Sequence, residues 1–230
     1  MIQVVSRTGI VFVLVIIMMM EVGRCMILND NSVEEIPNQM LQHMKEKYGI
    51  EFVAYDLEQC SYNQSYDRFR CYPKDGDPKT DLVEVYRNGK GNDITYKDTY
   101  FGIIIREDIE AEIMNNCQQL SLEAKVFCPH GSVYDNMYDS TKGYADFKND
   151  KNAPSLVVRI GVVFEPHFDT ENICNELFQT MEAKGLRGTF NVYFITKEAF
   201  NKLNRENNRD ILAPSADQIL ERYSRLMPRV

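Results

Sequence analysis

The C-terminal two thirds of the chain alternate short apolar runs with amphipathic segments, and this alternation constrains the fold more than any other feature. Runs rich in β-branched and aromatic residues lie at 100–106, 122–128, 156–164 and 189–195. Segments with apolar residues at helical spacing, 107–118 and 170–184, lie inside the first and the second pair of runs. Each pair therefore predicts a strand–helix–strand unit.

From this order we expect an α+β fold with an antiparallel or mixed sheet and its helices on one face. Two such units in one chain suggest the ferredoxin-like split βαβ arrangement. The front of the chain adds a predicted helix that ends at Gly49 and strands at 50–57 and 82–86, which would extend or flank the sheet. Residues 215–227 have the spacing of a final helix.

The connection between the two units is unusually long. It spans residues 129–154 and is rich in tyrosine and aspartate. Connections in compact domains are mostly shorter than about 12–15 residues. We therefore expect a structureless loop, or an aromatic and acidic surface that contacts a partner.

An uncharged apolar segment near the N-terminus predicts a leader. Residues 8–20 follow Arg7 and end at Glu21. A membrane-spanning helix needs about 20 apolar residues, whereas about 10–14 fit the apolar core of a signal peptide. We expect residues 1–25 to be a signal peptide or N-terminal membrane anchor that forms a leader helix.

The leader predicts the location of the remaining chain. Residues 26–33, which are polar at 29–32, form an expected short tether, and 34–230 form an expected single α+β domain. The domain would lie on the extracytoplasmic face of a bacterial cell membrane, attached to the membrane through the N-terminus, or it would be secreted.

Cys25 leaves two possibilities open at the end of the leader. Val22 and Cys25 stand where a bacterial lipobox has a branched apolar residue and the acylated cysteine, so Cys25 is a candidate for lipidation. Arg24 stands where the lipobox has a small residue. An ordinary cleaved signal, or an uncleaved short anchor, is the alternative.

The chain is acidic, with a formal net charge of −8 at pH 7. Nucleic-acid binding needs clustered lysine and arginine side chains that neutralise phosphates. We therefore predict no nucleic-acid partner, and expect a protein or another component of the cell envelope instead.

Five cysteines follow the leader, and an exported protein can oxidise them. Cys60 and Cys71 flank one irregular segment and could pair. Cys117 ends a predicted helix and Cys128 ends the next strand, about 20 Å away at ~3.3 Å per residue, whereas a disulfide allows about 7 Å between Cα atoms. The ferredoxin-like arrangement places Cys174 near Cys117, so Cys117–Cys174 is the better hypothesis. Buried free thiols are the alternative.

The sequence contains no strong catalytic, cofactor or metal motif. G-x-S-x-G, P-loop, H-E-x-x-H and C-x-x-C patterns are all absent. We therefore predict no catalytic residue, no cofactor and no metal ligand, and favour a non-enzymatic protein. The alternative is an extracytoplasmic hydrolase that uses His130, His167 and aspartates of the long connection. Those aspartates, which lack the spacing of a calcium-binding loop, are Asp135, Asp139, Asp146 and Asp150.

Three phrases in the front half resemble a known group of proteins. They are KYGIEFVAYDLE at 47–58, CYPKDGDPKTDLVEVYR at 71–87 and DTYFGIIIREDIEAEI at 98–113. They resemble small uncharacterised lipoproteins and membrane-anchored proteins of gut Firmicutes. This resemblance implies surface anchoring and no known enzymatic activity, and it supplies no catalytic residue. The sequence departs from the group at Arg24 and in its larger number of cysteines.

Overall fold

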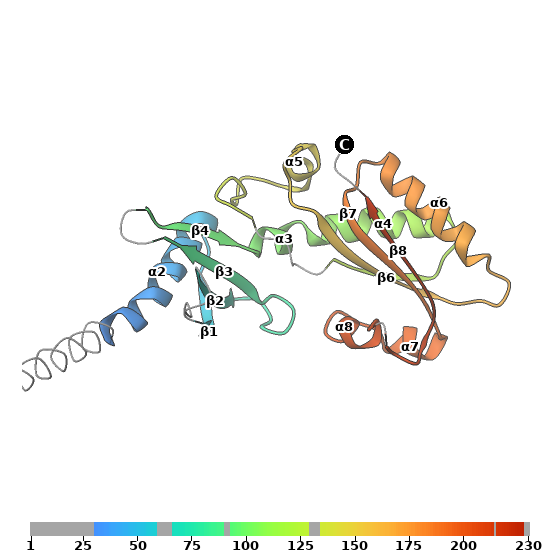
Figure 1. The fold of residues 1–230 in the computed structure, drawn as a ribbon, viewed down its shortest axis with the longest axis horizontal. Helices are drawn as coiled ribbons and strands as arrows, with labels where there is room; N and C mark the ends of the chain where they lie inside the picture. The colour runs from blue at the N-terminus through green and yellow to red at the C-terminus, as the bar shows by residue number, and fades with distance from the viewer. Residues whose placement is uncertain (1–29, 59–65, 90–92, 129–133, 214, 228–230) are drawn as a thin grey trace, which may run out of the picture.

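A computed structural model describes residues 30–58, 66–89, 93–128, 134–213 and 215–227 of the chain. Within these ranges the protein forms two lobes side by side, each with its own four-stranded sheet (Figure 1). The predicted leader, Cys25, Cys60 and His130 lie outside the described residues. No helix in the described part of the chain is both long enough and apolar enough to cross a membrane.

The N-terminal lobe is an antiparallel sheet of order β1-β2-β3-β4 with helix α2 packed on one face. Its elements are α2 (Asp30–Tyr48), β1 (Phe52–Glu58), β2 (Tyr66–Pro73), β3 (Val83–Asn88) and β4 (Thr95–Asp98). Met40, Met44 and Tyr48 recur every four residues on α2, so all three face the sheet, where they are buried. Gly49 ends the helix with a positive φ of 72°, the usual glycine stop.

The C-terminal lobe is a mixed sheet of order β5-β6-β7-β8. Its strands are β5 (Ala124–Phe127), β6 (Leu156–Val163), β7 (Gly188–Ile195) and β8 (Ile219–Met227). The pair β6 and β7 is parallel and connected through helix α6 (Thr170–Ala183), whereas β5 and β8 run antiparallel to their neighbours. Helices α4 (Arg106–Gln119) and α6 cover one face.

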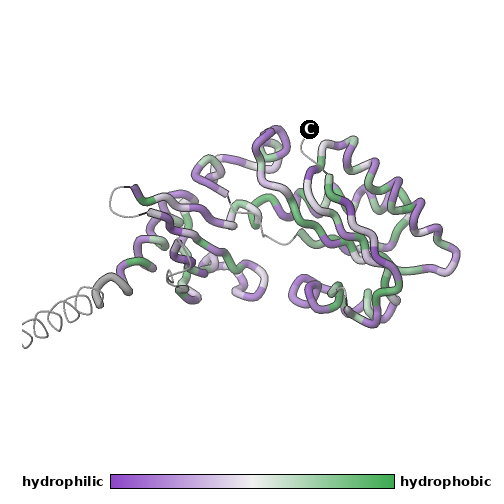
Figure 2. The backbone as a smooth tube through the Cα atoms, in the orientation of Figure 1, coloured by the Kyte–Doolittle hydropathy of each residue, from purple (hydrophilic) through white to green (hydrophobic). Residues whose placement is uncertain are grey.

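The two central strands of this lobe contribute apolar side chains to both faces of the sheet. Val158 and Ile160 of β6 point into the large core beneath α4 and α6. Val163 and the β7 residue Ile195 point to the other face, against α7 (Lys197–Lys202) and α8 (Asn208–Ile211). Strands buried on both sides have largely apolar sequences, and β6 and β7 are mostly apolar, with Arg159 and Asn191 as polar interruptions (Figure 2).

The structure confirms the α+β class and the mixed sheet, but the strand expected at 100–106 is wrong. These residues form helix α3 (Tyr100–Ile104) and the beginning of α4. Phe101, Ile105, Ile109 and Ile113 recur every four residues and are each at most 1% exposed, a helical period that overrides the local β-branched composition. The described chain therefore holds one βαβ unit, and the ferredoxin-like pair of units does not form.

Three further expectations are corrected. The final helix expected at 215–227 is strand β8, which completes hydrogen bonding along β7. The long connection contains helix α5 (Tyr144–Asn149), and its aromatic side chains Tyr134, Tyr138 and Phe147 are buried around Phe101 instead of forming a structureless loop or a contact surface. The last four residues of the expected tether belong to α2.

A buried polar network joins the two lobes. The Asp98 carboxylate at the end of β4 accepts hydrogen bonds from Lys47 Nζ at 2.7 Å, from the Tyr48 hydroxyl at 2.8 Å and from the Tyr100 backbone N–H at 2.9 Å. Lys47 also donates to the Asp135 carbonyl, and Asp98 exchanges two backbone hydrogen bonds with Tyr134. The same residue thus fixes α2, α3 and the connection that packs into the C-terminal core.

Candidate functional site: a basic cleft between the lobes

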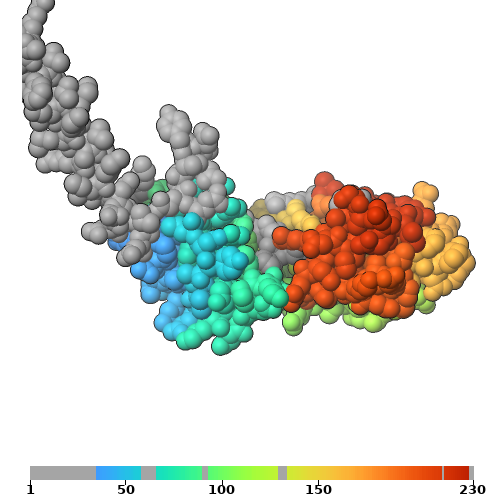
Figure 3. Space-filling model, turned by 90° about the horizontal axis from the view of Figure 1, so that it is seen from below, coloured from blue at the N-terminus to red at the C-terminus, as the bar shows by residue number. Residues whose placement is uncertain are grey.

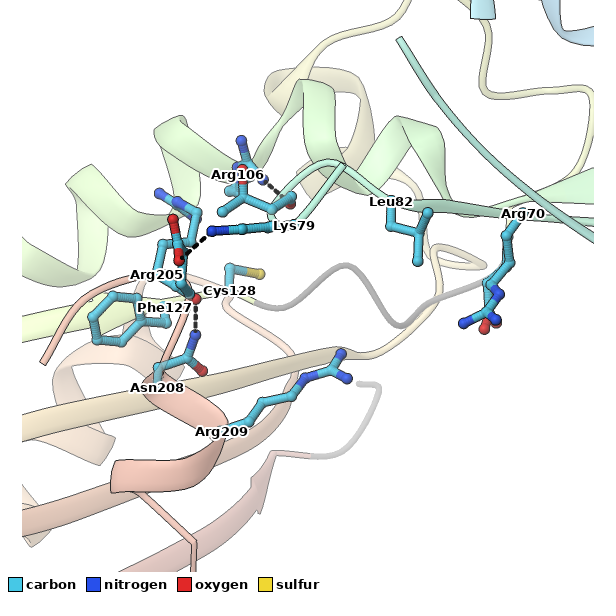
Figure 4. A pocket seen from close by; sticks show the side chains of 12 residues that line it. Arg70, Lys79, Leu82, Arg106, Phe127, Cys128, Arg205, Asn208 and Arg209 are labelled. Carbon is cyan, nitrogen blue, oxygen red and sulfur yellow. Dashed lines mark hydrogen bonds and ion pairs between the residues drawn. The ribbon is translucent and has the colours of Figure 1, made fainter. Parts of the chain in front are cut away.

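A cleft with a volume of about 400 Å³ lies where the two lobes meet. Figure 3 shows the green end of the N-terminal lobe against the orange segment that carries α7 and α8. The cleft is lined from both lobes by twelve side chains, shown in Figure 4: Arg70, Lys79, Thr80, Leu82, Glu84, Arg106, Phe127, Cys128, Arg205, Glu206, Asn208 and Arg209.

The lining is cationic although the protein is acidic. Five cations and two carboxylates line the cleft, whereas the whole chain has a formal net charge of −8. The cations come from separate elements: Arg70 from β2, Lys79 from the β2–β3 connection, Arg106 from the start of α4, and Arg205 and Arg209 from the segment between α7 and the end of α8. The fold therefore gathers positive charge that is dispersed in the sequence.

Arg106 is held rigidly in the wall of the cleft. Its Nη2 donates to Asp81 Oδ1 at 2.9 Å and its Nη1 to the Thr80 carbonyl at 3.1 Å. Burial would raise the pKa of Asp81, but the Asp77 backbone N–H and Arg106 stabilise the carboxylate and lower the pKa overall. The buried Arg106 Nε has no hydrogen-bond partner among the described residues, so this guanidinium retains an unused donor.

Arg205 is oriented by a carboxylate behind the cleft wall. Its two terminal nitrogens donate to Glu110 at 2.8 and 2.6 Å, and this hydrogen bonding raises the pKa of the arginine. A bidentate pair of this kind fixes the plane of the guanidinium. Arg70 is fixed in the same way by Asp56 of β1. The carboxylates thus hold two arginines in place before any ligand arrives.

Two cations are held weakly or not at all. Lys79 Nζ lies 3.3 Å from Glu206 across the cleft, and both side chains are exposed, so the pair contributes little to stability. Arg209 is exposed and forms no ion pair with the described residues. Figure 4 shows its side chain extending from α8 toward the side of the cleft formed by the N-terminal lobe. Arg209 is therefore the cation most open to a ligand.

Cys128 lies in the cleft lining, but its thiol is not activated. Burial first, and the nearby Glu110 carboxylate second, raise the pKa of Cys128 to about 12. Its backbone N–H donates to Glu110 Oε1 at 2.8 Å. A thiol with such a pKa is protonated at neutral pH and is a poor nucleophile. The cleft therefore offers recognition of negative charge and no activated thiolate.

His167 and the four aspartates, which are the described residues of the hydrolase alternative, do not line this cleft. His167 is 74% exposed, before α6, with its ring nitrogen 3.6 Å from the Glu165 carboxylate. The four aspartates of the long connection each accept a backbone N–H within their own turn or helix start, as aspartates in turns commonly do. No group of three potential metal ligands occurs in the ranges that the structure describes.

The predicted disulfides stay predictions. Cys117 and Cys174 lie in one core cluster, on the packed helices α4 and α6, and both are free thiols in the structure. Burial raises the pKa of each to about 12. Cys71 is a buried free thiol, and its expected partner Cys60 lies outside the described residues.

Comparisons with known proteins add little about function. No protein-family model and no curated protein matches the sequence. Among solved structures, the crystal structure of a DUF5037 family protein from Ruminococcus gnavus is similar, with a TM-score of 0.44 and 15% sequence identity, over 81% of this chain and 94% of that chain. A likeness at this level carries no functional argument, and the resemblance to anchored lipoproteins stays a prediction.

Proposed function

We propose that the protein is a non-enzymatic binding protein that holds a small anionic molecule in the basic cleft. The observation that carries the proposal is the convergence of five cationic side chains in one cleft of an acidic protein. The volume of about 400 Å³ falls in the range of small-molecule sites, roughly 300–1,000 Å³. Arginine donors held in place by carboxylates suit the planar oxygens of a carboxylate or phosphate group.

Replacing Arg209 by glutamine should weaken anion binding without changing the fold. Arg209 lacks an ion pair in the described structure and is exposed, so its loss removes a ligand contact and no internal one. A hydrogen bond to a charged group contributes about 1.5–3 kcal/mol, which is roughly a 10- to 150-fold change in Kd. Calorimetric titration with citrate and with inorganic phosphate, at low and high salt, measures the change.

Lys142→Gln is the matched control. Lys142 is exposed in the long connection and does not line the cleft, so this variant loses the same charge elsewhere. Its affinity should equal that of the unmodified protein, and both variants should keep the same melting temperature. Equal weakening in the two variants, or no binding of either probe to the unmodified protein, would contradict the proposal.

The extracytoplasmic location is the second part of the proposal, and it depends on the sequence of the leader. Mass spectrometry of the protein recovered from membrane and medium fractions should show cleavage at Cys25 or retention of an intact anchor. The same spectra report an acyl chain on Cys25, and peptide mapping without reductant reports whether Cys117 and Cys174 are joined. Full-length protein found in the cytoplasmic fraction would contradict the location without affecting the cleft.

A further inference from the structure

Strand β8 forms an edge of the C-terminal sheet and is long for such a position. It has nine residues, Ile219–Met227, and pairs with β7 on one side. No other strand of the described chain pairs with its outer side. Natural sheets protect an exposed edge with charged side chains, proline, a bulge or a short strand, because unpaired backbone groups recruit another strand. From Glu221 to Met227 the strand contains no proline and pairs regularly with β7, and its register shift lies at the N-terminal end of the strand, at Leu220.

One face of β8 carries exposed apolar side chains at both ends. Leu220 is 49% exposed and Leu226 is 67% exposed. Arg222 and Ser224 lie between them on the same face, since side chains alternate along a strand. The opposite face packs toward α6, where Tyr223 contacts Thr170 and Arg225 donates to Asn175. The exposed leucines are therefore not needed to attach β8 to its own lobe.

The sequence of β8 is complementary to itself when two copies run antiparallel with Tyr223 at the centre. In this register each residue meets a residue equally far from Tyr223 in the other copy. Leucine then meets leucine, and glutamate meets arginine; the cross-strand pairs are Leu220 with Leu226, Glu221 with Arg225, and Arg222 with Ser224. Apolar and opposite-charge pairs are the favourable cross-strand combinations.

We infer that the protein forms a two-fold symmetric dimer through antiparallel pairing of β8 with β8 of a second copy. Pairing about a two-fold axis uses the same surface on both copies and closes after two chains. It forms two leucine contacts and two glutamate–arginine pairs at once. In this register Arg222 faces Ser224 of the second copy and not the second Arg222. Its guanidinium lies over the Tyr193 ring at 5.6 Å and donates to Asn191 within its own chain.

A pair of cysteine substitutions tests the register. In the double variant that carries Leu220→Cys and Leu226→Cys, the thiol at position 220 of one copy faces the thiol at position 226 of the second copy. Within one chain the two positions are about 20 Å apart at ~3.3 Å per residue, beyond the reach of about 7 Å of a disulfide. Mild oxidation of the full chain should therefore give a covalent dimer that reductant reverses, whereas Leu220→Cys alone and Leu226→Cys alone should give none.

Mass measurements test the dimer itself. Light scattering after size-exclusion chromatography should give twice the monomer mass for the unmodified chain. The double variant that carries Leu220→Arg and Leu226→Arg should have the monomer mass, and its circular dichroism spectrum should equal that of the unmodified chain. A monomeric unmodified chain together with no cross-link in the double cysteine variant would overturn the inference. Cross-linking by a single cysteine variant would overturn the proposed register.

Discussion

Replacing Asp98 by alanine should lower the free energy of unfolding by about 3–5 kcal/mol, the usual cost of leaving a buried charge without its partner. Lys47 and Asp98 have side chains that are only 4% and 0% exposed, with Nζ 2.7 Å from Oδ2. Without the carboxylate, the Lys47 ammonium retains the Asp135 carbonyl as a hydrogen-bond acceptor but loses its counter-charge. In a protein of this size the melting temperature should fall by roughly 6–20 °C, measurable by calorimetry.

The same substitution should also loosen the junction of the two lobes. Asp98 connects Tyr48 of α2 to the beginning of α3, and the Tyr48 hydroxyl lies 3.0 Å from the Tyr138 carbonyl as well. Burial, followed by the Asp98 charge, raises the pKa of Tyr48 well above its usual range, so the phenol stays protonated as a donor. Hydrogen exchange should accelerate at Tyr134 and Tyr138, which the network holds against the C-terminal core.

Two further variants separate this effect from a general loss of charge. Asp98→Leu combined with Lys47→Met removes both charges and should recover much of the lost stability, since apolar replacements of a buried ion pair are often tolerated. Glu198→Gln breaks an exposed pair with Lys202 and should leave the melting temperature unchanged. A double variant as unstable as Asp98→Ala would show that the hydrogen bonds of Asp98, and not its charge, stabilise the junction.

The two central strands of the C-terminal sheet could be predicted from the sequence because both are largely buried. The runs at 156–164 and 189–195 are mostly apolar, and the segment between them has a clear helical period. At 100–106 the composition favours a strand, yet the period of four continues from Phe101 into α4. A seven-residue window is too short to distinguish the two, whereas the longer window shows the helix.

The basic cleft could not be predicted, because its residues are brought together only by tertiary structure. Its cations extend from Arg70 to Arg209 and belong to both lobes. Lys79 and Arg106 lie among acidic residues in the sequence, and the carboxylates that pair with the cations are equally dispersed. The one local indication is the spacing of Arg205 and Arg209, four residues apart. Strand β8 was missed for a similar reason: its hydrogen bonds are to β7, and its own sequence fits a helix as well.

Replacing Gly188 by alanine should destabilise the C-terminal lobe by about 3 kcal/mol or more, because backbone strain and a steric overlap add. Gly188 has a φ of 143°, and a Cβ placed there would lie 2.2 Å from the Leu156 carbonyl oxygen and 2.7 Å from the Leu156 nitrogen. Both contacts are with backbone, which cannot rotate away as a side chain can. The overlap falls where β6 and β7 begin their parallel pairing, with Leu156 opposite Gly188.

Gly185→Ala is the matched control, three residues earlier in the same turn. Gly185 also has a positive φ, 74°, but nothing lies within 4 Å of a Cβ at this position. Its substitution should therefore cost only the strain of the left-handed conformation, about 1–2 kcal/mol. Chemical denaturation should show the larger loss for Gly188→Ala, and hydrogen exchange should accelerate first at Leu156 and Val158. Equal losses at the two glycines would mean that strain alone, and not contact with β6, requires glycine at position 188.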